Sequence, residues 1–201
     1  MEAINKKHIS NLVASFFNIK SSFADVVVDA YIEVMREELL EGRRVQLFRG
    51  CRLTPNIKKA RVGRDPRTLK EYEIAARVTV VASQHNKFNF ELSKKRDMKV
   101  SLVQKLSSHK KIMNGKAFNL THANEVIEIF KSVFEGVRAG EFRIEIRSFG
   151  TFYCREYKER VSRNPKTGET LLVGSRAKLA FKLSEIFKDQ LMSSEFYSKY
   201  F

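Results

Sequence analysis

The chain has 201 residues and a net charge of +15, with a pI near 9.9. Hydrophobic residues make up 43% of it and 16 residues are Phe, which is enough apolar material for a folded core and excludes a disordered basic tail. So strong a positive charge predicts a polyanionic partner, with nucleic acid first and an anionic membrane surface second. No apolar run approaches the roughly 20 residues of a transmembrane helix, and residues 1–20 contain no signal-peptide core, so we expect a soluble intracellular protein.

Two helices are predicted at the start of the chain. Residues 6–17 form the shorter helix and residues 21–41 the longer one, in which apolar side chains recur at helical spacing. Ser21 or Ser22 is a candidate N-cap for the longer helix, because a hydroxyl accepts a hydrogen bond from a free backbone N–H. Gly42 is placed to end that helix, since glycine adopts the left-handed conformation without strain.

A strand and a basic turn come next. Residues 45–48 alternate as a half-buried strand does. The pentapeptide Arg64-Asp65-Pro66-Arg67-Thr68 is then a proline-centred turn between cations. Residues 88–92 alternate like another strand, and the charged residues 93–97 form a bridge into the second half.

The second half repeats this order. Helices are predicted over residues 100–108 and 121–139, and the latter begins with a capping box at Thr121 and ends at Gly140. A strand at residues 143–146 follows. The connection between the two helices is longer than its counterpart in the first half, so the halves are not interchangeable.

A near copy of the first pentapeptide follows in the second half. Arg163-Asn164-Pro165-Lys166-Thr167 lies 99 residues after Arg64-Asp65-Pro66-Arg67-Thr68. A recurrence at almost half the chain length, with matching flanks, indicates a tandem duplication. Each half therefore reads helix, helix, strand, strand, basic proline turn and strand.

Neither half offers enough apolar surface for a core of its own. A two-helix hairpin with a single apolar stripe leaves that stripe in water, so we expect the stripes of the two halves to pack on each other. The predicted fold class is α+β: one chain forms a pseudo-dimer, with a helical base and two protruding β-ribbon arms. The boundary is expected near residue 96, which gives repeats at residues 1–96 and 97–201.

Positive charge concentrates in the two arms rather than on the helices. Residues 49–70 contain eight Lys and Arg against one acid, and residues 155–182 contain eight against three. A charge run is most often a solvated face, but two matched basic hairpins are typical of a surface that binds nucleic acid. The candidate DNA-binding residues are Lys58, Lys59, Arg61, Arg64, Pro66, Arg67, Lys70, Lys158, Arg160, Arg163, Asn164, Pro165, Lys166, Arg176, Lys178 and Lys182.

No catalytic or metal-binding pattern accompanies this charge. The four histidines are scattered without a carboxylate or thiol constellation, and we interpret each as a surface residue. The sequence has no phosphate-binding loop or dinucleotide fingerprint. Cys51 and Cys154 have no neighbours at metal-ligand spacing and are interpreted as reduced packing residues. We therefore expect no enzyme, no metal, no cofactor and no small-molecule substrate.

Three segments of the second half stand in a specific order. Residues 143–152 read as a strand, a turn and a strand, residues 163–168 as a basic Arg-Asn-Pro turn, and residues 180–182 as a strand that returns before the last helix. In this order they resemble the saddle, the arm tip and the returning strand of the bacterial HU/IHF nucleoid-associated proteins. The resemblance covers nearly the whole chain, in two copies, and implies a β-saddle on the helical base and a place on the nucleoid in the bacterial cytoplasm.

The resemblance implies an architectural DNA-binding protein. Two β-ribbon arms would enter the minor groove of duplex DNA, and the proline at each tip, Pro66 or Pro165, would wedge between base pairs and kink the duplex. The cations beside each proline would hold the DNA backbone, while Asn164 would reach acceptors on base edges. Binding would be largely independent of sequence and would weaken steeply with salt.

The first half departs from this pattern. Asp65 replaces the tip asparagine, and Leu69 replaces the turn glycine found at Gly168. Residues 49–53 replace a small, glycine-rich turn with a segment that has two cations. We expect the second arm to kink DNA in the manner of the family, and the first arm to be weaker or differently aimed.

Alternatives from other classes are open at this point. The same basic arms could bind RNA, although few aromatic residues stand among the arm cations, or could clamp nucleic acid without kinking it, as part of an interaction scaffold. Two chains could also exchange halves, or associate further through a Phe-rich surface. The aromatic residues 195–201 are expected to pack against the helical base, with docking of a partner as the alternative.

Overall fold

The computed structural model describes residues 2–84, 98–113 and 118–199. The elements of the first half are β1 (Glu2–Asn5), α1 (Lys6–Phe17), α2 (Ser21–Leu40), β2 (Val45–Phe48), β3 (Cys51–Lys58), β4 (Arg61–Arg64), β5 (Glu71–Ile74) and β6 (Arg77–Gln84). Those of the second half are α3 (Met98–Ser107), α4 (Lys110–Met113), α5 (Leu120–Ala139), β7 (Phe142–Ile146), β8 (Gly150–Tyr157), β9 (Arg160–Arg163), β10 (Thr170–Val173), β11 (Arg176–Leu183), α6 (Glu185–Ser193) and α7 (Glu195–Ser198). Helix α5 and strands β8 to β11 each begin 99 residues after their counterparts α2 and β3 to β6, which confirms the tandem duplication.

Helix α2 starts one residue earlier than a serine cap would allow. Its N-cap is Lys20, in extended conformation, and the Lys20 side chain makes no capping hydrogen bond. Ser21 and Ser22 lie in the first turn, so the expected serine cap is wrong. The Lys20 carbonyl already accepts hydrogen bonds from the Phe23 and Ala24 N–H groups, and the helix therefore begins one residue before a serine cap would place it. The other end is as expected, with Gly42 at φ 72°.

Helix α5 is capped by Asn119 rather than by Thr121. The Asn119 side chain accepts a hydrogen bond from the His122 N–H at 3.0 Å, and the His122 ring accepts one from the Asn119 N–H at 3.3 Å. A capping box is therefore present, but it begins two residues before the expected position and uses a histidine as its second member. Gly140, at φ 85°, ends the helix as expected.

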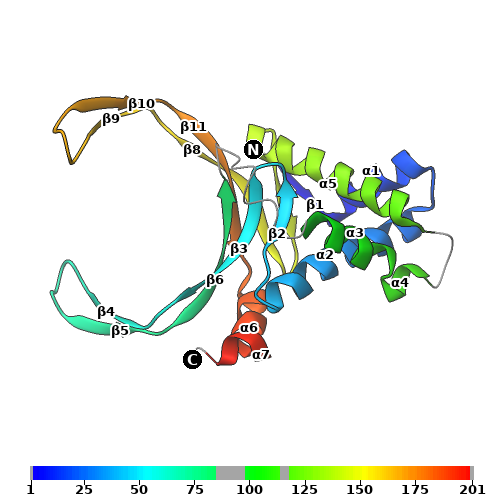
Figure 1. The fold of residues 1–201 in the computed structure, drawn as a ribbon, viewed down its shortest axis with the longest axis horizontal. Coiled ribbons are helices and arrows are strands. Elements are labelled where there is room, and N and C mark those ends of the chain that lie inside the picture. The colour runs from blue at the N-terminus through cyan, green and yellow to red at the C-terminus, as the bar shows by residue number, and fades with distance from the viewer. Residues whose placement is uncertain (1, 85–97, 114–117, 200–201) are drawn as a thin grey trace.

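The helices of the two halves pack against each other and form the base of the molecule (Figure 1). Helix α1 contacts α5, and helix α2 contacts α3. Tyr31 on α2 and Phe130 on α5 are fully buried, and their ring centroids lie 4.1 Å apart. The apolar stripes of the two halves therefore meet in one core, as the sequence predicts.

A buried carboxylate also joins the halves. Glu38 on α2 is 3% exposed, and its oxygens lie 2.8 Å from Nε of Arg43 and 2.5 Å from Nζ of Lys105 on α3. Burial by itself would raise the pKa of Glu38, but the hydrogen bonds from Arg43 and Lys105 outweigh it and hold the pKa below its ordinary value. Glu38 is therefore a charged link between α2 and α3.

Two sheets connect the helical base to the arms (Figure 1). One has the strand order β2-β3-β6 and the other the order β1-β7-β8-β11. Strand β1 belongs to the first half but pairs in parallel with β7 of the second half, from Glu2 opposite Phe142 to Asn5 opposite Glu145. The sequence did not predict this strand, which builds the start of the first half into the sheet of the second.

Helices α6 and α7 return to the base. Tyr197 is 1% exposed, and its hydroxyl donates a hydrogen bond to the Leu39 carbonyl of α2 at 2.9 Å. The Phe196 ring lies over Gly42 and leaves no room there for a Cβ. The aromatic segment that begins at residue 195 therefore packs on the base, as expected, as far as residue 199.

Three expectations fall outside the described residues. They are the strand at residues 88–92, the charged bridge at residues 93–97 and the boundary near residue 96.

Candidate nucleic-acid interface

Two β-ribbons leave the sheets on the side away from the helices and curve toward each other (Figure 1). In the first ribbon β3 and β6 pair over their whole lengths, and β4 and β5 continue the ribbon as far as Arg64 opposite Glu71. In the second ribbon β8 and β11, then β9 and β10, repeat this arrangement and end at Arg163 opposite Thr170. These are the two predicted arms, and we call residues 51–84 the first arm and residues 150–183 the second arm.

The tip of the first arm is a tight turn closed by three hydrogen bonds. The Asp65 N–H donates to the Lys70 carbonyl at 3.0 Å, and the Leu69 N–H donates to the Asp65 carbonyl at 2.9 Å. Nε of Arg64 donates to the Leu69 carbonyl at 3.0 Å. Pro66 is exposed in this turn, at the far end of the ribbon.

The tip of the second arm has the same three hydrogen bonds. The Asn164 N–H donates to the Glu169 carbonyl at 2.9 Å, and the Gly168 N–H donates to the Asn164 carbonyl at 2.8 Å. Nε of Arg163 donates to the Gly168 carbonyl at 2.8 Å. The two pentapeptides therefore build one kind of turn, and Pro165 is exposed in the same position as the proline of the first arm.

The turn keeps its shape although one tip lacks the glycine. Gly168 has φ 75°, in the left-handed region that glycine adopts freely. Leu69 occupies the equivalent position with φ 56°, a conformation that is unfavourable for a side chain with a Cβ. The first tip thus keeps the same hydrogen-bonded turn as the second, with local strain at Leu69.

All sixteen candidate DNA-binding residues lie on the arms, and all are exposed except Lys178, which is half-buried. Lys178 and Lys182 lie in the part of the second arm closest to the base, opposite Arg155 and Thr151. The other fourteen lie further out, toward the two tips. The structure therefore brings the predicted residues together as two basic ribbons.

The arms also carry acidic and apolar side chains, and sequence reasoning missed Glu71 and Glu73 among the acids. Glu71 and Glu73 on β5 are exposed and lie opposite Arg64 and Val62. Alternation along residues 71–74 is the signal that could have placed them on a strand. The exposed apolar side chains of the arms are Val62, Leu69, Tyr72, Val81, Tyr157, Val161, Leu171 and Leu172.

Two tyrosines of the arms are held by their neighbours. The Tyr157 ring has the guanidinium groups of Arg155 and Arg176 at 5.3 and 5.2 Å from its centroid. The Tyr72 ring lies against Gly63, where a Cβ would come within 2.9 Å of it. Because two cations of the same arm already contact the Tyr157 ring, this ring is less available as a platform for a stacked nucleobase.

Among the described residues no group of three or more His, Cys, Asp or Glu side chains is placed to hold a metal ion. His109 is not the surface residue that we expected, because its side chain is only 13% exposed and its Nε2 lies 3.3 Å from the Glu33 carboxylate. Cys51 and Cys154 are free thiols, and burial raises the pKa of Cys51 to about 11.

Over residues 2–84, 98–113 and 118–199, no helix combines the length and apolarity that crossing a membrane requires.

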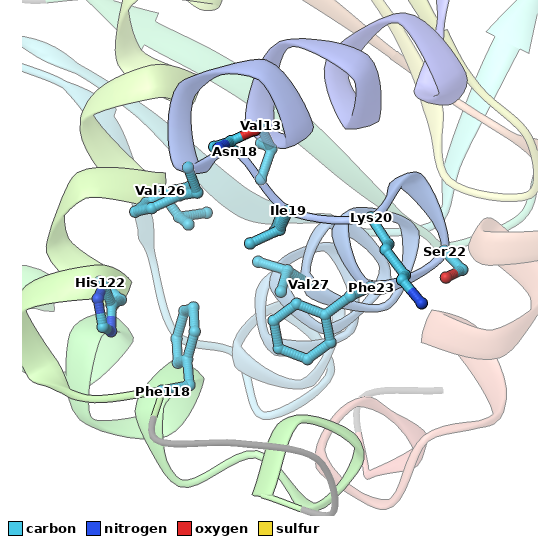
Figure 2. A pocket seen from close by; sticks show the side chains of 11 residues that line it. Val13, Asn18, Ile19, Lys20, Ser22, Phe23, Val27, Phe118, His122 and Val126 are labelled. Atoms are coloured by element: carbon cyan, nitrogen blue, oxygen red, sulfur yellow. The ribbon is translucent and has the colours of Figure 1, made fainter.

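A pocket of about 690 Å³ lies in the base, between the α1–α2 connection and the start of α5 (Figure 2). Its walls are mainly apolar, with Val13, Ile19, Phe23, Phe118 and Val126 among the side chains that face it. Such a lining does not suit a polyanion. The candidate interface for nucleic acid is therefore the pair of arms and not this pocket.

Both halves of the chain are similar to known proteins. A family model described as "Bacterial DNA-binding protein" matches residues 4–93 and again residues 98–192. Integration host factor subunit alpha of an Anaeromyxobacter species is 39% identical over 79 residues, which are 39% of this chain and 79% of that protein. The same subunit of Bdellovibrio bacteriovorus is 32% identical over 79 residues, covering 39% of this chain and 72% of that protein. A cocrystal structure of Anabaena HU with DNA shares 22% identity at a TM-score of 0.39, over 47% of this chain and 97% of that one.

The two matches to the family model together span most of the chain, one in each half. They agree with the repeat of helices, strands and arm tips at a spacing of 99 residues. The chain therefore belongs to the bacterial DNA-binding protein family, that of HU and integration host factor, and carries the family's domain twice.

Proposed function

We propose that this architectural DNA-binding protein bends duplex DNA with its two arms. The observation that carries the proposal is the pair of matching tips, in which Pro66 and Pro165 are exposed at the ends of two ribbons that leave one base on the same side (Figure 1). A proline ring is rigid and apolar and has no N–H to leave unsatisfied, so it can replace base stacking where a base-pair step opens. Each arm would follow the minor groove, and each proline would wedge between base pairs.

The sixteen candidate residues would form the DNA contacts. Thirteen of them are Lys or Arg, and the other three are Pro66, Asn164 and Pro165. Unstacking a step costs a few kcal/mol and bending a short site adds roughly 1–6 kcal/mol, which the phosphate contacts must offset. Since phosphate contacts do not distinguish sequences, we expect broad binding with a preference for nicked or flexible DNA, and binding that weakens steeply with salt.

The chain would act as a pseudo-dimer, with residues 1–96 as one repeat and residues 97–201 as the other. The Tyr31–Phe130 contact and the pairing of β1 with β7 support this, because each joins the two halves. One chain would then supply both arms, so the pairing of arms would not depend on protein concentration. The place of such a protein is the nucleoid, in the bacterial cytoplasm.

Energy transfer between dyes at the two ends of a duplex of roughly 30 base pairs tests the proposal. The protein is titrated at two salt concentrations into intact and nicked versions of one sequence, while anisotropy reports binding. A rise in transfer at low salt, stronger for the nicked duplex, supports bending. Binding without any rise would show that the arms clamp DNA without kinking it, and tighter binding of a matched RNA duplex would favour an RNA partner.

A further inference from the structure

The two arm tips differ in the hydrogen-bonding groups that they offer. Their turns are closed by the same three hydrogen bonds, so the backbone presents the residue before each proline in the same way. That residue is Asp65 in the first arm and Asn164 in the second. The difference between the tips at this position is therefore one of side-chain chemistry on a shared scaffold.

Asn164 offers hydrogen-bond donors. Its side chain is exposed, and its Oδ1 accepts a hydrogen bond from the Lys166 N–H at 3.0 Å. The amide oxygen is thus engaged within the turn. The amide nitrogen has two N–H donors and gives this side chain a donating capacity that a carboxylate lacks.

Asp65 offers only acceptors. Its Oδ1 accepts hydrogen bonds from the Arg67 N–H at 2.8 Å and the Thr68 N–H at 3.4 Å. These bonds hold the pKa of Asp65 below its ordinary value, and the bond from the Arg67 N–H has the largest effect. The side chain is therefore an anion at neutral pH. A carboxylate has about four lone-pair sites, so acceptor capacity remains after the turn is formed.

The minor groove of DNA presents both kinds of partner. A·T pairs show only acceptors there, adenine N3 and thymine O2, whereas G·C pairs add one donor, the guanine 2-amino group. We propose that the two tips read these opposite patterns: Asp65 accepts a hydrogen bond from the guanine amino group at the first wedge, and Asn164 donates to adenine N3 or thymine O2 at the second. The inference rests on the proposed insertion of the arms into the minor groove, and it gives the protein a preferred direction on a duplex whose two kinked steps differ in base composition.

The first tip keeps a positive charge in spite of its carboxylate. Residues 64–70 carry a net charge of +2, from three cations and Asp65, whereas residues 163–169 carry +1, from two cations and Glu169. The cation Lys70 stands where the second tip has Glu169. Phosphates would therefore still attract the first tip, and we expect the arms to differ in base preference rather than in the presence or absence of affinity.

The test replaces guanine by inosine, which lacks the 2-amino group and keeps the major-groove edge. Anisotropy measures the affinities of wild type and Asp65→Asn for a guanine duplex and for the inosine duplex of the same sequence. Inosine also softens the duplex, so the informative quantity is the guanine-to-inosine affinity ratio of wild type divided by that of Asp65→Asn. We expect a value of at least about fivefold, the lower end for one specific base contact.

Two further variants make the test specific. Glu73→Gln removes a carboxylate from the same arm and should keep the wild-type ratio, because Glu73 lies on β5 and not in the tip. Asn164→Asp should raise the ratio, since it gives the second tip the same acceptor. Equal ratios for wild type and Asp65→Asn, on duplexes that energy transfer shows to be bent, would overturn this inference alone. Absence of bending on every duplex would overturn the proposed function and this inference with it.

Discussion

The variant Glu38→Gln tests whether a buried ion pair joins the two halves. Glu38 is 3% exposed and contacts Nε of Arg43 at 2.8 Å and Nζ of Lys105 at 2.5 Å. Glutamine keeps the shape but loses the charge, and its amide nitrogen cannot accept from the second cation. Each hydrogen bond to a charged group contributes about 1.5–3 kcal/mol to stability. The side chains of Arg43 and Lys105 are 45% and 33% exposed, so in the variant water can hydrate both cations and offset part of the loss. We expect the free energy of unfolding to fall by about 2 kcal/mol.

The loss should depend on pH in a defined direction. The pKa of Glu38 in the folded protein lies below its ordinary value near 4.5, so its stabilisation is fully present above that pH and disappears as the pH falls through the folded value. The difference in unfolding free energy between wild type and Glu38→Gln should therefore be largest near neutral pH and should shrink in acid.

Urea unfolding followed by circular dichroism, at neutral pH and in acid, measures this difference. Glu37→Gln is the matched control, because Glu37 is the exposed neighbour on the same helix and loses the same charge. The control should change the unfolding free energy by less than about 0.5 kcal/mol. Equal losses for the two variants, or a loss for Glu38→Gln that stays constant in acid, would refute the reasoning.

Three other changes test the arms and the segment after α6. Leu69→Gly should relieve the backbone strain at φ 56°. The N–H at position 69 donates to the Asp65 carbonyl, and its protection against hydrogen exchange should rise by about fivefold. Lower protection would argue against strain there. Tyr197→Phe removes the buried hydrogen bond to the Leu39 carbonyl and should cost about 1 kcal/mol in urea unfolding, whereas unchanged stability would show that this bond contributes nothing. Lys166→Ala should make the slope of log affinity against log salt shallower by about 0.9, and an unchanged slope would mean that Lys166 does not reach a phosphate.

The parts of the fold that the sequence predicts well depend on local chemistry that occurs twice. The apolar periodicity of α2 and α5 is read within each helix, and the two helices begin 99 residues apart, as the duplication requires. The arm tips follow from a proline turn between cations, a pattern of five residues. A second copy of each signal made these predictions stronger than either copy alone.

The parts that the sequence did not predict depend on residues far apart in the chain. Strand β1 is only four residues long, and it exists because β7, in the other half, offers an edge to pair with. Glu38 reads as one more acid on an amphipathic helix, and only its contact with Lys105 on α3 shows that it is buried. Asn119 and Thr121 are both acceptable caps by composition, and the path of the backbone decides between them. The strain at Leu69 likewise becomes visible only with the backbone angle.

Bending by proline wedges is tested most directly with the variant Pro66→Ala/Pro165→Ala. End-to-end energy transfer across a nicked duplex is measured for this variant and for wild type, at protein concentrations where anisotropy shows that the duplex is saturated. Since the arm cations remain in the variant, we expect binding with the same salt dependence but with most of the rise in transfer lost. A variant that raises the transfer as much as wild type does would contradict a role for the prolines in bending.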